Sequence, residues 1–137
     1  MPIDTADDAE TAFYAAFESL DLPALRALLD PTAVCVHPGG TLLQGTEAVL
    51  QSWAEIFASA DPPRIEFQVV QRTWSGDLAV HLVEEHIYAN GKTSAKPAPV
   101  LATNTYLRRD GSWKLLAHHA SLPLMRRTAG HGTTKLH

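Results

Sequence analysis

Two adjacent histidines stand near the end of the last stretch of the chain that has a regular pattern. The stretch TNTYLRRDGSWKLLAHHAS, residues Thr103 to Ser121, reads as two strands joined by a tight turn, with His118 and His119 in the second strand. Imidazole is the side chain whose unperturbed pKa lies nearest neutrality, so a histidine aimed into a cavity can carry a proton or bind an acidic group. The hairpin therefore predicts a pocket with acid–base chemistry.

The register of this hairpin decides which side chains share a face. We interpret Arg109-Asp110-Gly111 as a three-residue loop with Gly111 in the left-handed conformation. Because side chains alternate across a strand, this register puts Asn104, Leu116 and His118 on one face. The other face then carries Thr103, Thr105, Leu107, Trp113, Leu115, Ala117 and His119. Both faces mix polar and apolar residues, so hydrophobicity alone does not say which of them meets the core.

Helices are expected in the first half of the chain and strands in the second. Apolar residues follow the helical period in three segments, Ala9–Leu20, 21–29 and 46–57, and Asp30-Pro31 and Asp61-Pro62-Pro63 end the last two. A β-branched run ending at His37 predicts one strand between the second and third helices. Four further strand-like runs follow, at Arg64–Trp74, Ala79–Tyr88, Val100–Leu107 and Trp113–Ser121. The pattern predicts an α+β fold.

Length and charge narrow the class of protein. The chain has 137 residues, of which 45% are hydrophobic, so we expect one domain over residues 1–124 and a mobile tail over 125–137. The net charge of -4 without a basic stripe argues against nucleic acid, and no apolar run is long enough to span a bilayer. The single cysteine, Cys35, excludes an internal disulfide, and the acidic N-terminus does not read as a secretory signal. We expect a cytoplasmic protein.

The order of these elements resembles the nuclear transport factor 2-like superfamily, in particular its SnoaL-like branch of cone-shaped α+β domains. The resemblance is carried by LLDP, by VCVHPGG followed by GTEAVLQSW, by GDLAV, and by TNTYLRRDGSWKLLAHHAS, and it covers about Ala9 to Ser121. The last segment is also similar to the association domain of calcium/calmodulin-dependent kinases. The resemblance implies a curved antiparallel sheet wrapped around three helices, and a homodimer formed through the outer face of the sheet. Function does not follow, because this fold hosts isomerases, dehydratases, cyclases, hydrolases and dimerisation modules.

The resemblance also implies which strand residues point into the cone. Asn104 and His118 match inward positions, and the preceding strand contributes Glu85 with Val83 and Ile87. A glutamate beside a histidine in an apolar cone would shift both pKa values, which is how such sites acquire an acid and a base. The alternative is that Glu85 and His118 only satisfy each other as a buried polar pair.

His37 is a second candidate for proton transfer. It precedes Pro38 at the position where the ketosteroid isomerase branch carries an aspartate as general base, although it could equally donate to the turn that follows. The position of that family's oxyanion tyrosine is matched by Phe13, with Tyr14 one residue away and expected to turn elsewhere. Its second acidic position falls near Thr103 or Asn104, neither of which is acidic. The residues are therefore not those of a ketosteroid isomerase.

Aromatic residues are expected to line the predicted pocket, and no metal is expected in it. Trp53 and Phe17, with Tyr106 on the strand of Asn104, are candidates to line the cone, although aromatic residues at helical spacing are more often core. His118 and His119 point to opposite faces and no HxxxH or HxH pattern occurs, so we expect no metal. Phosphate-binding motifs are also missing from the sequence, and we expect no cofactor. We interpret Cys35 as a small buried hydrophobe.

Two functions remain open. The preferred hypothesis is a protein that binds a small, mostly apolar molecule, or a cofactor-independent isomerase, dehydratase or cyclase that uses His37, Glu85 and His118 as proton carriers and Asn104 to orient the ligand. The alternative is a homodimeric association module with a vestigial or effector-binding cavity. An open cone with unpaired polar groups would favour the first hypothesis, and a closed core in which His118 and Glu85 bind backbone atoms would favour the second.

Overall fold

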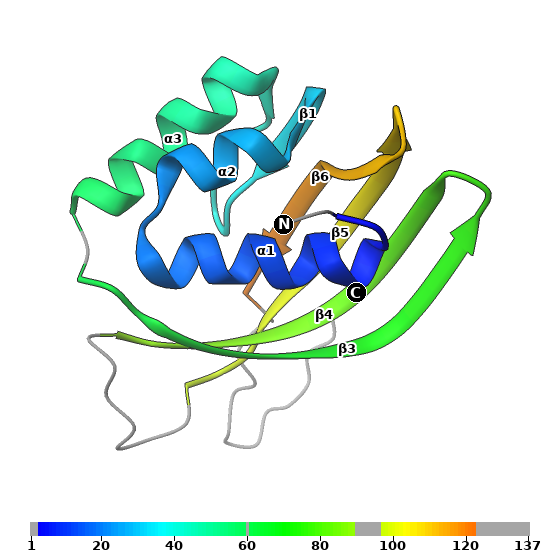
Figure 1. Cartoon of the computed structure of the whole chain (residues 1–137). Helices are drawn as coiled ribbons and strands as arrows, with labels where there is room; N and C mark the ends of the chain where they lie inside the picture. Colours follow the sequence, from blue (N-terminus) through cyan, green and yellow to red (C-terminus); the bar gives the residue numbers. More distant parts are fainter. Residues whose placement is uncertain (1–2, 60, 90–96, 123–137) are drawn as a thin grey trace.

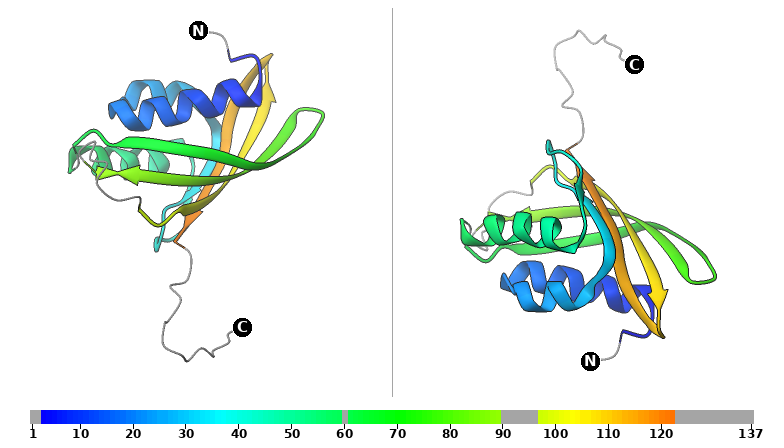
Figure 2. Two further views of the ribbon diagram at one scale, coloured as in Figure 1. Left: turned by 90° about the horizontal axis from the view of Figure 1, so that it is seen from below. Right: turned by 90° about the horizontal axis from the view of Figure 1, so that it is seen from above.

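The computed structural model describes residues 3–59, 61–89 and 97–122, and it has the expected α+β architecture (Figure 1). Its elements in order are α1 (Ala6–Ser19), α2 (Leu22–Leu28), β1 (Leu29–Val36), β2 (Leu43–Gln44), α3 (Thr46–Ala58), β3 (Arg64–Ser75), β4 (Leu78–Tyr88), β5 (Val100–Arg109) and β6 (Ser112–Ser121). The three helices lie on one side of a curved sheet, as both views in Figure 2 show. The tail predicted at 125–137 lies outside the described residues.

The sheet is mixed, whereas the sequence predicted an antiparallel one. Its strand order is β2-β1-β6-β5-β4-β3, and β1 runs parallel to β6 while the other neighbours are antiparallel. The reason is the connection, because the chain leaves β1, passes through β2, α3 and the strands β3, β4 and β5, and returns on β6 in the direction of β1. The short strand β2 was not predicted, since two residues are too few to show an alternating pattern.

Side-chain caps mark the beginnings of α1 and α2. Thr5 Oγ1 accepts a hydrogen bond from the Asp8 amide at 3.0 Å, and Asp21 caps α2 in the same way through Ala24. Helix α2 ends at Leu28, because Leu29 already has extended backbone and begins β1. The sequence prediction had kept Leu29 in the helix until Asp30-Pro31.

The β5–β6 turn is shorter than predicted. Asp110 and Gly111 both have positive φ, 55° and 80°, so they form a two-residue turn in which Arg109 pairs with Ser112. The ladder then shifts between Thr105 and Tyr106, because Thr105 pairs with Ala117 and Tyr106 with Leu115. Asn104 consequently lies directly opposite His118.

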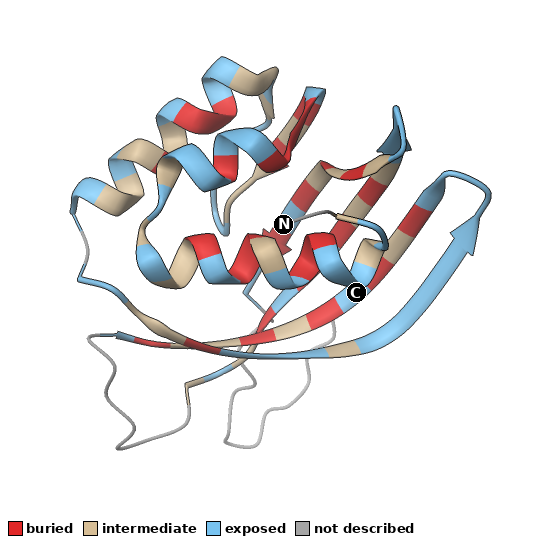
Figure 3. Ribbon diagram, viewed as in Figure 1, coloured by how far each residue is buried: buried red, intermediate tan, exposed pale blue. Residues whose placement is uncertain are grey.

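The corrected register moves two residues from the outer face to the core. Trp113 and Leu115, expected on the outer, dimer-facing side, are only 8% and 2% exposed and belong to the hydrophobic core. The inner face of the sheet and the facing sides of the helices are buried, whereas β3 is largely exposed (Figure 3). Among the described residues, no helix is long and apolar enough to cross a membrane.

Candidate functional site

Helix α1 carries two polar side chains into the core. Glu10 and Tyr14 are one helical turn apart, so they lie on the same side of α1, and both are buried. They meet buried polar residues of the three central strands, which share the inner face by alternation: His81 and Glu85 on β4, Asn104 and Tyr106 on β5, and His118 on β6. The inward direction predicted for Glu85, Asn104 and His118 is confirmed.

Hydrogen bonds link His118 to Glu85 through two intermediates. His118 Nδ1 lies 2.6 Å from Asn104 Oδ1, the Asn104 amide donates to the Tyr14 hydroxyl at 3.0 Å, and that hydroxyl donates to Glu85 Oε2 at 2.5 Å. Glu85 and His118 are therefore not hydrogen-bonded to each other, and the alternative of a direct buried pair between them is wrong. They are the two ends of one chain of hydrogen-bonded side chains.

Glu10 anchors this chain from the other side. Its Oε2 accepts hydrogen bonds from the Asn104 amide at 3.2 Å and the Tyr106 hydroxyl at 2.8 Å, and its Oε1 lies 2.9 Å from His81 Nδ1. Both oxygens of this buried carboxylate are thus occupied, as a buried charge requires. Tyr106 was predicted to contact a ligand, and in the structure its hydroxyl group donates this hydrogen bond to Glu10.

The environment separates the proton affinities of the two ends. Burial, partly offset by the hydrogen bond from Tyr14, raises the pKa of Glu85 from 4.5 to about 7. Burial, with smaller contributions from His37 and His119, lowers the pKa of His118 from 6.5 to about 3. Near neutral pH the site thus holds an imidazole that stays neutral and a carboxyl that readily gains or loses a proton. Of the two groups, Glu85 has the pKa that general acid–base chemistry needs.

His37 lies apart from this chain. Its Nε2 is 2.9 Å from Ser52 Oγ on α3, and Ser52 in turn donates to the Val49 carbonyl, so the imidazole is the donor to the serine. The turn expected to bind the imidazole is closed by the backbone, because the Gly40 amide donates to the His37 carbonyl at 2.8 Å. Burial lowers the pKa of His37, which favours the neutral ring.

Aromatic rings fill the space between His37 and His118. The Trp53 ring centroid lies 4.8 Å from that of His37 and 6.0 Å from that of His118, and Phe13 lies 5.0 Å from His118. Trp53 is 2% exposed, and its indole nitrogen has no hydrogen-bond partner in the described part of the chain. Cys35 is buried as predicted, and burial raises the pKa of its thiol to about 12, so it is unreactive.

A cavity of about 710 Å³ opens where the C-terminal ends of α1 and α3 lie near the end of β4. Phe17, Ile56, Pro63 and Ile87 are part of its wall, and the Phe17 ring lies 4.9 Å from that of Trp53. Neither Glu85 nor His118 reaches this cavity. The aromatic layer of Phe17 and Trp53 therefore lies between the open vestibule and the buried acid–base chain.

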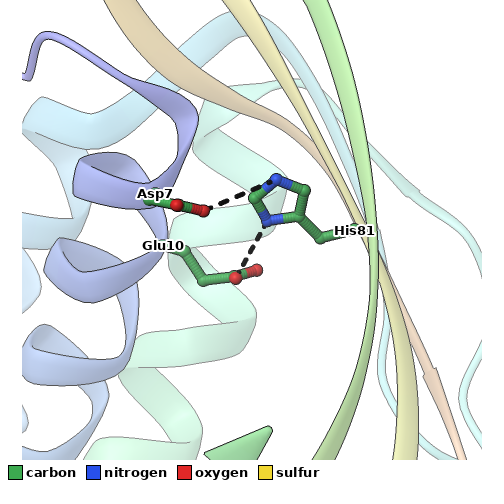
Figure 4. A group of neighbouring side chains, drawn as sticks. All are labelled: Asp7, Glu10 and His81. Atoms are coloured by element: carbon green, nitrogen blue, oxygen red, sulfur yellow. Dashed lines mark hydrogen bonds and ion pairs between the residues drawn. The ribbon is translucent and has the colours of Figure 1, made fainter. Parts of the chain in front are cut away.

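Asp7, Glu10 and His81 form a cluster whose ligand atoms lie within 4.8 Å of one another (Figure 4). The two carboxylates face different nitrogens of the ring, Glu10 at Nδ1 and Asp7 at Nε2. Arg72 also binds Asp7 at 2.9 Å, so a cation is already in place there. The geometry fits a histidine held between two carboxylates better than a metal site, which would need both acids at one nitrogen.

Four residues of the site were missed in the sequence analysis. Glu10, His81 and Ser52 were not among the predicted site residues, and Tyr14, expected to turn away, is instead central. A signal was present for three of them. Glu10 and Tyr14 have helical spacing, and His81 has the strand parity of Glu85.

The outer face of the sheet carries a second, smaller hollow of about 480 Å³. Its lining includes Val70, Leu82, Leu101 and His119, and the three aliphatic side chains are 59%, 41% and 44% exposed. Exposed apolar side chains that gather on one face can mark an interaction site.

Comparisons with known proteins agree with this architecture. The sequence model of the family described as SnoaL-like domain matches residues 7–125. A proposed calcium/calmodulin-dependent protein kinase type II association domain from Thiobacillus denitrificans is 32% identical, with a TM-score of 0.85 and coverage of 90% of this chain and 99% of that one. A proposed dehydratase of the NTF2-like family from Streptomyces avermitilis is 33% identical, with a TM-score of 0.77 and coverage of 90% and 96%.

A curated relative is a longer protein. The F-box protein SKIP8 of Arabidopsis thaliana is 26% identical over 91 residues, which are 66% of this chain and 37% of that protein. The chain thus spans little more than a third of that relative.

Proposed function

Because the chain belongs to the SnoaL-like domain family, we propose that it binds a small, mostly apolar molecule in the cone and transfers protons on it without a cofactor. The observation that carries the proposal is the buried chain from His118 through Asn104 and Tyr14 to Glu85. It joins a neutral imidazole to a carboxyl of raised pKa inside an aromatic enclosure. Isomerisation, dehydration and cyclisation are the reaction types that need only such groups.

The polar bonding pattern supports a ligand rather than a closed core. His118 and Glu85 bind side chains and not backbone atoms, and the Trp53 indole nitrogen is left unpaired among the described residues. In this proposal Glu85, whose pKa of about 7 suits proton transfer at neutral pH, accepts and returns the proton. His118 accepts a hydrogen bond from the ligand, and Asn104 positions the imidazole. His37 lies beyond Trp53, so its role would be at the opposite side of the same ligand.

Filling the vestibule tests the proposal. We expect Ile87→Trp to block entry of apolar probes such as naphthalene derivatives, because Ile87 is part of the cavity wall. His86→Trp is the control, since His86 neighbours Ile87 on β4 and points the other way. Calorimetric titration should show binding to the parent and to His86→Trp, with loss of binding in Ile87→Trp. Equal binding to all three proteins would place the ligand elsewhere.

A homodimer is the second candidate function, and the apolar outer face favours it. Leu82 and Leu101 are exposed on that face, and the similar protein from Thiobacillus denitrificans is described as an association domain. In this proposal two copies pack sheet to sheet, in the cytoplasm, and the cavity is vestigial or binds an effector. Such a dimer is also compatible with a catalytic cone, because the two surfaces lie on opposite faces of the sheet.

The oligomeric state tests this second candidate. Leu101→Glu puts a charge in the outer hollow and should shift sedimentation from dimer to monomer. Leu42→Glu is a matched control, because Leu42 is 58% exposed in the β1–β2 connection, outside the hollow. A parent that sediments as a monomer, or a Leu101→Glu variant that stays dimeric, would rule out this interface.

A further inference from the structure

The orientation of the Asn104 amide is fixed by its surroundings. Its nitrogen lies 3.2 Å from Glu10 Oε2 and 3.0 Å from the Tyr14 hydroxyl, which itself donates to Glu85. A flipped amide would put its oxygen against the Glu10 carboxylate and leave that acceptor unpaired, at a cost of roughly 1–3 kcal/mol. Asn104 therefore presents its oxygen to His118.

This orientation selects one tautomer of His118. An amide oxygen only accepts, so the ring nitrogen 2.6 Å from it, Nδ1, must carry the proton. In the neutral ring the other nitrogen, Nε2, then keeps its lone pair. The hydrogen bond of His118 to Asn104 uses Nδ1, and Nε2 is not one of the buried unpaired atoms of the described chain, so we take it as the nitrogen open to a ligand. Glu10, acting through Asn104, thus makes His118 a hydrogen-bond acceptor at the inner end of the cone.

The charge of the cone restricts the ligand further. Glu10 and Glu85 are both buried there, and no lysine or arginine is buried in the described part of the chain. His81, a basic side chain that is buried there, already pairs with Glu10. An anionic group would therefore be desolvated beside two carboxyl groups without a cation of its own, which is costly. Trp53, whose unpaired indole N–H is a donor, lies beside His118 with ring centroids 6.0 Å apart. A hydroxyl group of a ligand can donate to Nε2 of His118 and accept from the indole N–H of Trp53.

We propose that the inner end of the cone recognises a neutral hydroxyl group on an apolar compound, and that Glu10 is the positioning residue that sets His118 to receive it. The inference rests on the proposed function, because it requires that the cone binds ligands at all. It names the class of ligand, an alcohol or phenol rather than a carboxylate or an ether.

Three probes that share one ring system separate the possibilities. 2-Naphthol offers a hydroxyl donor, 2-methoxynaphthalene offers only an acceptor, and 2-naphthoate is an anion. We expect 2-naphthol to bind the parent about tenfold more tightly than the ether, because only the naphthol can donate a hydrogen bond to the imidazole nitrogen. The naphthoate should bind more weakly than both. If no probe binds, the proposed function fails; if the ether or the anion equals the naphthol, only the hydroxyl recognition fails.

The tautomer is measured independently by nitrogen-15 NMR of the histidine side chains. The free parent should show His118 protonated at Nδ1 and not at Nε2, and the opposite result would overturn the inference whatever the probes do. Glu10→Met removes the acceptor that orients Asn104, so it should mix the tautomers and abolish the preference for naphthol. Tyr106→Phe is the matched control, because Tyr106 donates to the same Glu10 oxygen without contacting His118 through a hydrogen bond. An equal change in Tyr106→Phe would show a merely structural effect and reject the positioning role.

Discussion

At the scale of single residues, the bond between Tyr14 and Glu85 controls the acid end of the site. The two oxygens lie 2.5 Å apart, and both groups are buried. A phenol that donates to a carboxylate stabilises the ionised form, so this bond opposes the rise in the pKa of Glu85 that burial causes. Conversely, burial and the negative charge of Glu85 raise the pKa of Tyr14, so its hydroxyl stays protonated and can donate the hydrogen bond.

Tyr14→Phe should therefore raise the pKa of Glu85 above its value of about 7. The phenylalanine keeps the stacking surface that Tyr14 offers to Phe67, whose ring centroid lies 4.3 Å away, and removes only the hydroxyl. Carbon-13 NMR of the labelled carboxyl group follows the titration directly. Tyr106→Phe serves as the control, since Tyr106 donates to Glu10 and not to Glu85. An unchanged or lowered pKa of Glu85 in Tyr14→Phe would contradict the role of the hydroxyl.

The site was predictable from strand residues and not from helix residues. The resemblance to a known fold supplied the inward direction of Glu85, Asn104 and His118, and alternation along β4 then points to His81 as well. Tyr14 was missed because the apolar stripe of the first helix was drawn through Phe13. Tyr14, the next residue, was then expected to point away from the core. A buried stripe on a helix is wide enough to include such a flank, and here it carries the polar anchors.

At the scale of elements, the β5–β6 hairpin shows how a turn decides the faces of a sheet. A one-residue error in loop length exchanges the two faces, which is why Trp113 and Leu115 were predicted outside and lie inside. The bulge at Leu116 exchanges the faces again beyond it. His118 thus points inward in both registers. Asp-Gly is the strongest signal for a two-residue turn, but a bulge leaves no comparable signal in the sequence.

Gly111→Ala tests the turn on which this register depends. The φ angle of 80° at Gly111 is strained for any residue with a Cβ atom, although no atom would contact that Cβ within 4 Å. We expect the free energy of unfolding to fall by about 1 kcal/mol, measured by urea denaturation. Asp110→Asn should leave it nearly unchanged, because asparagine tolerates the left-handed conformation at least as well as aspartate. Equal stability of Gly111→Ala and the parent would mean that the turn has a different conformation in solution.

At the scale of the whole molecule, Glu85 and His118 oppose each other in the dependence of stability on pH. The pKa of Glu85 is raised on folding, from 4.5 to about 7, so folding favours its protonated form and stability falls as pH rises through this window. The pKa of His118 is lowered, from 6.5 to about 3, so stability falls as pH decreases through that window. Between pH 4.5 and pH 6.5 the two effects offset each other. The parent should show a near-plateau there, with a shallow loss of stability toward low pH from His37, whose pKa burial also lowers.

Glu85→Gln should remove one side of this balance. At pH 8 the variant should be more stable than the parent, by at most about 3 kcal/mol for a shift of roughly 2.5 pKa units, because it has no buried charge to accommodate. Near pH 4 the two proteins should be alike, since Glu85 is then protonated in both the folded and the unfolded chain. The near-plateau should become a slope, with the stability of the variant decreasing from pH 6.5 downward under the influence of His118 together with His37.

Urea denaturation between pH 4 and pH 8 measures both curves. Glu84→Gln is the matched control, because Glu84 neighbours Glu85 on β4 and points to the opposite face, where it is only partly buried. Its curve should keep the near-plateau of the parent. A parent curve without a near-plateau, or a Glu85→Gln variant that follows the parent at every pH, would mean that the carboxyl at position 85 is not buried against the helices, and the proposed acid–base chain would lose one of its two ends.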